Sequence, residues 1–147
     1  MQSTHNKIKS AILDSMKGEI IFSSNFSKYG TEVAVRHVFS RLCKEGFLIR
    51  LSAGIYLYPE IDKEIGAIYP SIEKIAKEIA KQEKARIIPT GVYALNALGL
   101  STQIPMRVVF LTDGTPRMIN FQRKVKQIML AKLLLPKHLF QLLVEQF

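Results

Sequence analysis

The first third of the chain shows a succession of short apolar patterns, each with the spacing of a different element. Ile8, Ile12 and Leu13 recur at helical spacing, so residues 4–16 predict a helix, and Gly18 after them is a natural stop. The run EIIFSS follows, and because it is apolar and then turns polar, it predicts a short strand.

Two helices separated by a turn are predicted next. The segment SNFSKYG predicts a short helix that Ser24 or Asn25 opens and Gly30 closes. The segment TEVAVRHVFSRLCKEG predicts the best-defined helix of the chain, because Thr31 is a suitable N-cap and Gly46 lies just past the end.

The helix from Thr31 has two sides of different character. Its apolar stripe consists of Val35, Val38, Phe39 and Leu42, and its other side consists of Arg36, His37, Ser40, Arg41 and Lys44. Two β-rich runs follow, FLIRL and GIYLY, and predict a hairpin in which Gly54 takes a positive φ. Helix, strand, helix, turn, helix and hairpin, in this order, are typical of a winged helix-turn-helix.

In that fold the polar side of the third helix would face DNA. Arginine can donate two hydrogen bonds to guanine in the major groove, while lysine, serine and backbone amides near the helix start can hold phosphates. Arg50 and Ser52 of the hairpin would then lie near the DNA backbone. The ordinary alternative is that this side of the helix is simply solvated.

The second half predicts a separate small α/β lobe. Residues 59–70 hold two prolines and a glycine and are typical of a joint between lobes. Beyond them, Ser71 opens a helix striped by Ile72, Ile75, Ala76 and Ile79, whose charged face holds Glu73, Lys77, Lys81 and Lys84, and RIIP, RVVFLTDG, RMINF and VKQIML predict strands. We therefore expect an α+β chain with a winged helix-turn-helix domain at 1–58, a linker at 59–70 and an α/β domain at 71–147.

The segment PTGVYALNALGLSTQIP lies between two of these strands and has almost no charge. It predicts a short helix that starts at Thr90 and Gly91 and ends at Gly99, with an apolar face of Tyr93, Ala94, Ala97 and Leu98. Asn96 and Gln103 are predicted to tie the following turn together, so the segment is interpreted as scaffold, and Pro105 then forces extension into the next strand. A helix from Lys137 is predicted to cap the second lobe; an oligomer or partner surface is the alternative.

Composition narrows the class of partner. With 21 lysines and arginines against 12 acids, the net charge is +9 and the pI about 9.8, which favours nucleic acid first and an acidic protein second. Cys43 is the only cysteine, which excludes an internal disulfide and a multi-cysteine zinc site and is typical of the cytoplasm. Its place beside Leu42 and Phe39 predicts a buried, unreactive thiol. We expect no signal peptide, no membrane span and no cofactor.

Catalysis is not expected. A nucleotidyltransferase needs carboxylates that converge on magnesium and a Gly-Ser phosphate loop. The only candidate magnesium ligands are Asp113 in a turn and Asp62 with Glu64 in the joint, and no Gly-Ser-rich loop precedes a helix. His37 and Cys43 are predicted to lie on different faces of one helix, so they cannot form a nucleophile and base pair.

Three segments carry a family resemblance. PTGVYALNALGLSTQIP with RVVFLTDGTPRMI, preceded by RLCKEGFLIRLSAGIYLYP, resembles the AbiEi-like antitoxins of type IV toxin-antitoxin systems and a related bacterial winged-helix family of unknown function. The likeness covers roughly residues 5–130 in a consistent order. Members usually continue well past the last strand, so we expect a shortened C-terminal domain here.

The resemblance implies a function in two parts. The N-terminal domain would bind and repress its own promoter, with DNA contacts carried over to Thr31, Arg36, His37, Ser40, Arg41 and Arg50, and the second domain would counteract a nucleotidyltransferase-like toxin. A homodimer on a palindromic operator is one arrangement that fits. A stand-alone winged-helix regulator and a double-stranded RNA-binding module are the alternatives.

Overall fold

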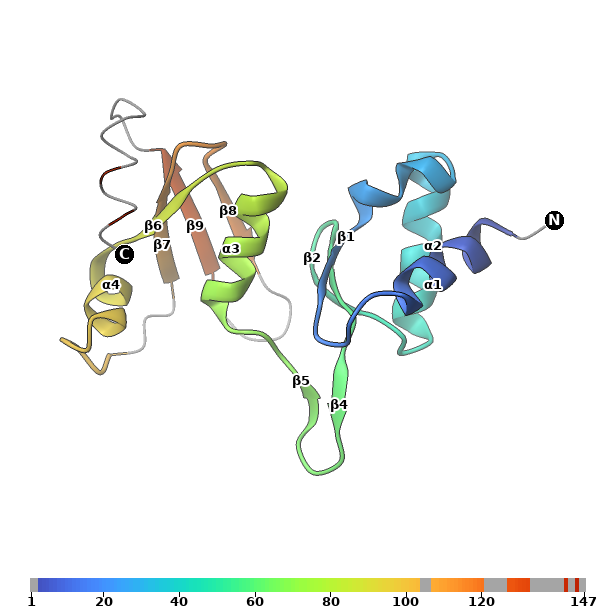
Figure 1. Cartoon of the computed structure of the whole chain (residues 1–147), viewed down its shortest axis with the longest axis horizontal. Coiled ribbons are helices and arrows are strands. Elements are labelled where there is room, and N and C mark those ends of the chain that lie inside the picture. The colour runs from blue at the N-terminus through green and yellow to red at the C-terminus, as the bar shows by residue number, and fades with distance from the viewer. Residues whose placement is uncertain (1–2, 104–106, 121–126, 133–141, 143–144, 146–147) are drawn as a thin grey trace. The chain divides into compact units, whose positions relative to one another are not determined.

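The structure is a computed structural model, and it describes residues 3–103, 107–120, 127–132, 142 and 145. The chain divides into two compact units, Met1–Pro70 (unit 1) and Ser71–Phe147 (unit 2), which are described separately (Figure 1). The described residues hold four α-helices, one 3-10 helix and three sheets, so the predicted mixture of α and β elements is confirmed.

Unit 1 begins with three helices. They are α1 (Thr4–Leu13), the 3-10 helix η1 (Ser23–Tyr29) and α2 (Glu32–Lys44). The N-cap prediction for α2 is confirmed, because the backbone N–H of Ala34 donates to Oγ1 of Thr31 at 3.2 Å, and Gly46 beyond its end has φ +75. The predicted opening of the short helix at Ser24 or Asn25 is wrong, since η1 begins one residue earlier without a side-chain cap.

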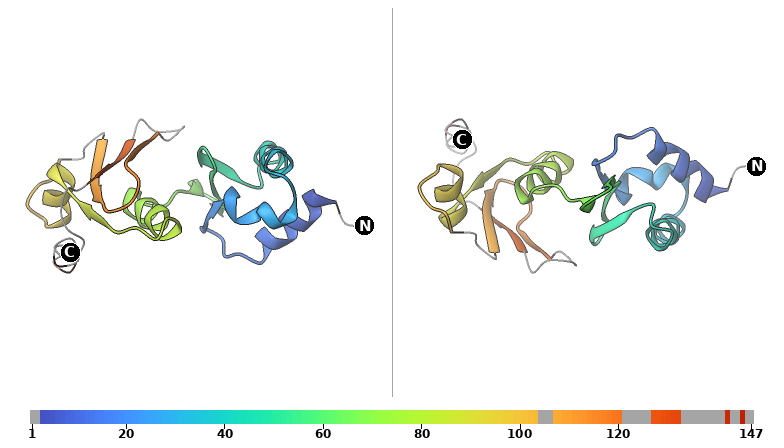
Figure 2. Two further views of the ribbon diagram at one scale, coloured as in Figure 1. Left: turned by 90° about the horizontal axis from the view of Figure 1, so that it is seen from above. Right: turned by 90° about the horizontal axis from the view of Figure 1, so that it is seen from below.

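The helices of unit 1 pack on a small antiparallel sheet, seen from two sides in Figure 2. Its strands are β1 (Ile20–Phe22), β2 (Ile49–Ser52) and β3 (Ile55–Leu57), in the order β1-β3-β2. Ile8 and Ile12 of α1 are fully buried, whereas Leu13 is 57% exposed, because it lies about 100° around the helix from Ile12. Phe39 of α2 packs on Tyr56 of β3 with ring centroids 4.7 Å apart, so α2 and the β2–β3 hairpin are in direct contact.

The segment predicted as a joint has structure of its own. It contains β4 (Glu60–Asp62) and β5 (Gly66–Ile68), which pair antiparallel as a separate two-stranded sheet (Figure 1). The division of the chain into units places this hairpin with unit 1.

Unit 2 is a mixed four-stranded sheet with α3 (Ile72–Gln82) alongside it. The strands are β6 (Ile87–Pro89), β7 (Arg107–Thr112), β8 (Arg117–Asn120) and β9 (Gln127–Lys132), in the order β6-β7-β9-β8. β7 and β9 are parallel, and the other pairs are antiparallel. Ser71 caps α3 as predicted, because its Oγ accepts from the backbone N–H of Lys74 at 3.2 Å.

The Leu-Thr-Asp-Gly run after β7 forms a tight packing point. Asp113 accepts a hydrogen bond from the backbone N–H of Arg86 at 2.7 Å, which ties the turn to the start of β6. The buried Oγ1 of Thr112 accepts from the N–H of Gly114 at 3.0 Å. A Cβ on Gly114 would lie 2.6 Å from Cβ of Ala85, so only glycine allows this approach.

The PTGVYALNALGLSTQIP segment forms α4 (Gly91–Ala97). The predicted turn contact is confirmed for Asn96, whose Nδ2 donates to the carbonyl oxygen of Gln103 at 3.0 Å, and Gly99 has φ +73. The predicted apolar face is wrong in part: Tyr93 packs on Phe110, but Ala97 and Leu98 are exposed. The predicted effect of Pro105 and the predicted helix from Lys137 lie outside the described residues.

Candidate nucleic-acid interface

The polar side of α2 is presented to solvent as predicted. Arg36, His37, Ser40, Arg41 and Lys44 are all exposed, while the stripe of Val35, Val38, Phe39 and Leu42 is buried. Because the buried stripe fixes how the helix is turned, the direction of every exposed side chain follows from the spacing of about 100° per residue. His37, Ser40 and Lys44 point outward, and Arg36 and Arg41 flank them.

Arg36 lies on the edge of α2 that meets the β2–β3 hairpin. It falls within about 20° of Cys43 around the helix, since the two are seven residues apart. Burial raises the pKa of the Tyr56 hydroxyl, and the positive charges of both Arg50 and Arg36 act against that rise. Burial likewise raises the pKa of the Cys43 thiol, against the charge of Arg50. Positive charge from both α2 and β2 therefore acts on the Tyr56 hydroxyl.

A glutamate at the start of α2 holds Arg36. Nη2 of Arg36 lies 2.7 Å from Oε1 of Glu32 one turn earlier, and the side chains are 71% and 86% exposed. An exposed pair of this kind adds little stability. Its effect is to hold the guanidinium against the first turn of α2.

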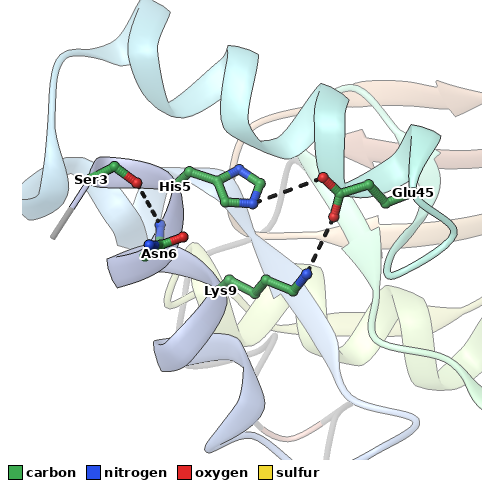
Figure 3. Close-up of polar contacts among 5 residues, drawn as sticks. All are labelled: Ser3, His5, Asn6, Lys9 and Glu45. Carbon is green, nitrogen blue, oxygen red and sulfur yellow. Dashed lines mark hydrogen bonds and ion pairs between the residues drawn. The ribbon is translucent and has the colours of Figure 1, made fainter.

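The other edge of α2 is tied to α1 by an acid, as Figure 3 shows. Oε2 of Glu45 lies 3.3 Å from Nζ of Lys9, and Oε1 lies 3.9 Å from Nε2 of His5. Nζ of Lys9 also lies 5.1 Å from the centre of the Phe47 ring. Lys9 and His5, both on α1, thus lie beside Glu45 within unit 1. The cations that face solvent on this part of the surface are those on the outward side of α2.

The last two candidate residues are Thr31, at the start of α2, and Ser52, at the end of β2. Thr31 is exposed, and while its Oγ1 accepts the capping hydrogen bond, its O–H can still donate. Ser52 is partly exposed at the end of β2, where the pairing with β3 is irregular. The tip beside it is held by Gly54, which has φ +73 and accepts at its carbonyl oxygen from the N–H of Ser23.

Two residues of this surface escaped the sequence interpretation. Glu32 is one of them, and its i, i+4 spacing to Arg36 is the signal that could have revealed the pair. Val33 is 59% exposed on the outward side, among the polar residues. An exposed apolar side chain at this place can contact a thymine methyl group.

The carboxylates considered for metal binding have local roles. Oδ1 of Asp62 accepts from the backbone N–H of Glu64 at 2.8 Å and of Ile65 at 3.1 Å, and these bonds lower the pKa of Asp62. Oδ1 of Asp113 accepts a hydrogen bond from the backbone N–H of Arg86. Among the described residues, no group of three histidine, cysteine or acidic side chains could hold a metal ion.

Comparison with known families places the chain. A family model matches residues 7–142, and the chain belongs to this family, a family of unknown function designated DUF6088. No curated protein and no solved structure gives a significant match. None of the helices in the described part of the chain is long and apolar enough to cross a bilayer.

Proposed function

We propose that unit 1 is a winged helix-turn-helix domain that binds double-stranded DNA, and that the chain is a transcriptional repressor that is, or is related to, the antitoxin of a type IV toxin-antitoxin system. The observation that carries the proposal is the exposed polar side of α2, a helix whose buried side packs against the β2–β3 hairpin.

The order of elements in unit 1 supports the winged-helix assignment. α1, η1 and α2 are followed directly by the β2–β3 hairpin, and β1 completes the sheet beside β3. In this arrangement α2 takes the place of the recognition helix and the β2–β3 hairpin that of the wing. The helix can enter the major groove because its outward side has no neighbour within unit 1 that buries it.

The roles of the cations follow from their positions. Arg36, in the first half of α2 and oriented by Glu32, is assigned to a base contact, because residues near the N-terminus of a recognition helix reach the base edges. Arg41 and Lys44, in the last turn, are assigned to phosphates, as are Arg50 and Ser52 on the wing. His37 and Ser40 lie between these groups.

The antitoxin assignment rests on the resemblance in unit 2. The structure gives the resembling segments structural roles there: the Leu-Thr-Asp-Gly turn locks β7 to β6, and Asn96 closes the turn after α4. We assign toxin neutralisation to unit 2 because the resemblance implies this function for the second domain. A stand-alone regulator would have the same unit 1 without a toxin gene beside its own.

DNA binding is tested with the full chain and the duplex upstream of its own reading frame. With about four to six phosphate contacts, the logarithm of affinity should fall with the logarithm of salt at a slope of about −4 to −5. Arg36→Ala should weaken binding to this duplex by about 1–3 kcal/mol and change binding to scrambled DNA little. Arg41→Ala should weaken both about equally and reduce the slope by about one.

Lys81→Ala on α3 is the matched control, since it removes an exposed cation from unit 2 and should leave DNA affinity unchanged. A flat salt response would refute DNA binding by unit 1. Stronger binding to an RNA duplex of the same sequence would favour the RNA-binding alternative. Toxin neutralisation is tested by co-expression with the product of the neighbouring reading frame.

A further inference from the structure

Val33 is an apolar side chain at the centre of the polar side of α2. The buried stripe of the helix fixes which way this side faces. At about 100° per residue, Val33 lies within about 20° of Ser40 and Lys44 around the helix axis and within about 40° of His37. Val33 therefore points in the same direction as these candidate DNA contacts, and of the four it lies nearest the start of the helix.

The chemistry of valine limits what it can contact in a DNA groove. The structure describes every residue of α2, and Val33 is the only exposed one that is apolar. A single exposed valine is common on a protein surface, so its direction is what matters here. The base edges in the major groove present hydrogen-bond donors, acceptors and one apolar group, the C5 methyl of thymine. A valine that faces this groove therefore matches thymine and no other base.

The first turn of α2 carries a negative charge beside Val33. Glu32 is 86% exposed, and its Oε1 lies 2.7 Å from Nη2 of Arg36. The start of a helix otherwise attracts phosphate, but an exposed carboxylate there repels it. Phosphate contacts are thus favoured at the other end of the helix, where Arg41 and Lys44 lie in the last turn. The turn that holds Val33 is better suited to the base edges than to the DNA backbone.

We propose that Val33 contacts the C5 methyl group of a thymine and makes DNA binding by unit 1 selective for a T·A pair at one position of its site. This inference rests on the proposed function of unit 1. Arg36 follows Val33 by three residues, and residues spaced by three on zinc-finger helices contact successive bases. Since arginine pairs best with guanine, the T·A pair is expected next to the G·C pair that Arg36 contacts.

The test uses the full chain and a duplex site that the chain selects from a pool of random sequences. Each thymine of the site is replaced in turn by deoxyuridine, which lacks only the C5 methyl group. At one position, beside a G·C pair whose preference is relaxed in Arg36→Ala, the wild-type affinity should fall about fourfold, the effect of one buried methyl group. Val33→Ala should bind the thymine site about fourfold more weakly than the wild type and should not distinguish it from the deoxyuridine site.

Leu13→Ala is the matched control, because Leu13 on α1 is 57% exposed, nearly as much as Val33 at 59%, and its replacement should leave the discrimination intact. The salt slope should be the same for the wild type and Val33→Ala, since valine neutralises no phosphate. Equal wild-type affinity for thymine and deoxyuridine at every position, or discrimination that survives in Val33→Ala, would overturn this inference and leave DNA binding standing. A flat salt response would refute the proposed function and this inference together.

Discussion

The turn at Gly114 offers the sharpest test of how unit 2 is held together. In Gly114→Ala the new Cβ would lie 2.6 Å from Cβ of Ala85, whereas carbon atoms in contact normally lie about 3.5–4.0 Å apart. Cβ of Ala85 is fixed to the backbone just after α3 and cannot rotate away. Either the turn or the end of α3 must move by about 1 Å.

The cost follows from what the movement breaks. Overpacking of this kind costs about 1–3 kcal/mol. The hydrogen bonds from Gly114 to Thr112 and from Arg86 to Asp113 lie at the same point and would be lengthened. We expect a loss of about 2–3 kcal/mol in the free energy of unfolding of unit 2. With a slope of about 1–2 kcal/mol per molar urea for a unit of this size, the midpoint should fall by about 1–3 M.

The assay is urea unfolding followed by circular dichroism, with hydrogen exchange by mass spectrometry to assign each change to a unit. Gly99→Ala is the matched control in the same unit, because Gly99 also has a special conformation, φ +73, but has open space around its Cβ position. It should cost about 1 kcal/mol from backbone strain alone. If Gly114→Ala lowers the midpoint no more than Gly99→Ala does, the contact with Ala85 is not what selects glycine.

Three further outcomes are expected. Asn96→Ala removes the bond to the carbonyl group of Gln103 and should lower the stability of unit 2 by about 0.5–1 kcal/mol in thermal melts while DNA affinity is kept; a normal melt with lost binding would make this segment a site. The Cys43 thiol, whose pKa is raised by burial, should react with a disulfide reagent at pH 8 about tenfold more slowly than free cysteine, and an equal rate would contradict its packing. Hydrogen bonding from Lys77 lowers the pKa of Glu73, so ionised Glu73 stabilises the fold above the ordinary glutamate pKa of about 4.3, and this stabilisation is lost as pH falls through the lower folded pKa. In acid unfolding, Glu73→Gln should therefore lose less stability than the wild type. Equal losses would exclude a stabilising role for the Glu73 charge.

Local signals predicted the helices of unit 1 because they act within a few residues. The cap at Thr31 and the buried stripe of α2 depend on spacings of three and four, which a sequence displays directly. The same stripe determined which cations face solvent. Periodicity alone misplaced Leu13 and Leu98, because both helices end close by and nothing covers these side chains.

Contacts between distant segments were beyond such reasoning. The sequence assigned Glu73 only to the charged face of its helix, yet its carboxylate accepts from the Tyr93 hydroxyl, twenty residues away, at 3.4 Å. The action of the Arg36 and Arg50 charges on one hydroxyl, that of Tyr56, likewise depends on how α2 packs against the hairpin. Neither has a signal in the spacing of one segment, since both arise from the tertiary fold.

The position of β9 between β7 and β8 has a consequence for synthesis on the ribosome. β9 ends at Lys132, which is 62 residues after Pro70, the last residue of unit 1. At about 5–20 residues per second, roughly 3–12 s pass between the completion of these two points, longer than most small domains need to fold. Unit 1 can therefore fold co-translationally, while β7 has only β6 to pair with, and β8 has no partner strand, until the strand that joins them has been made.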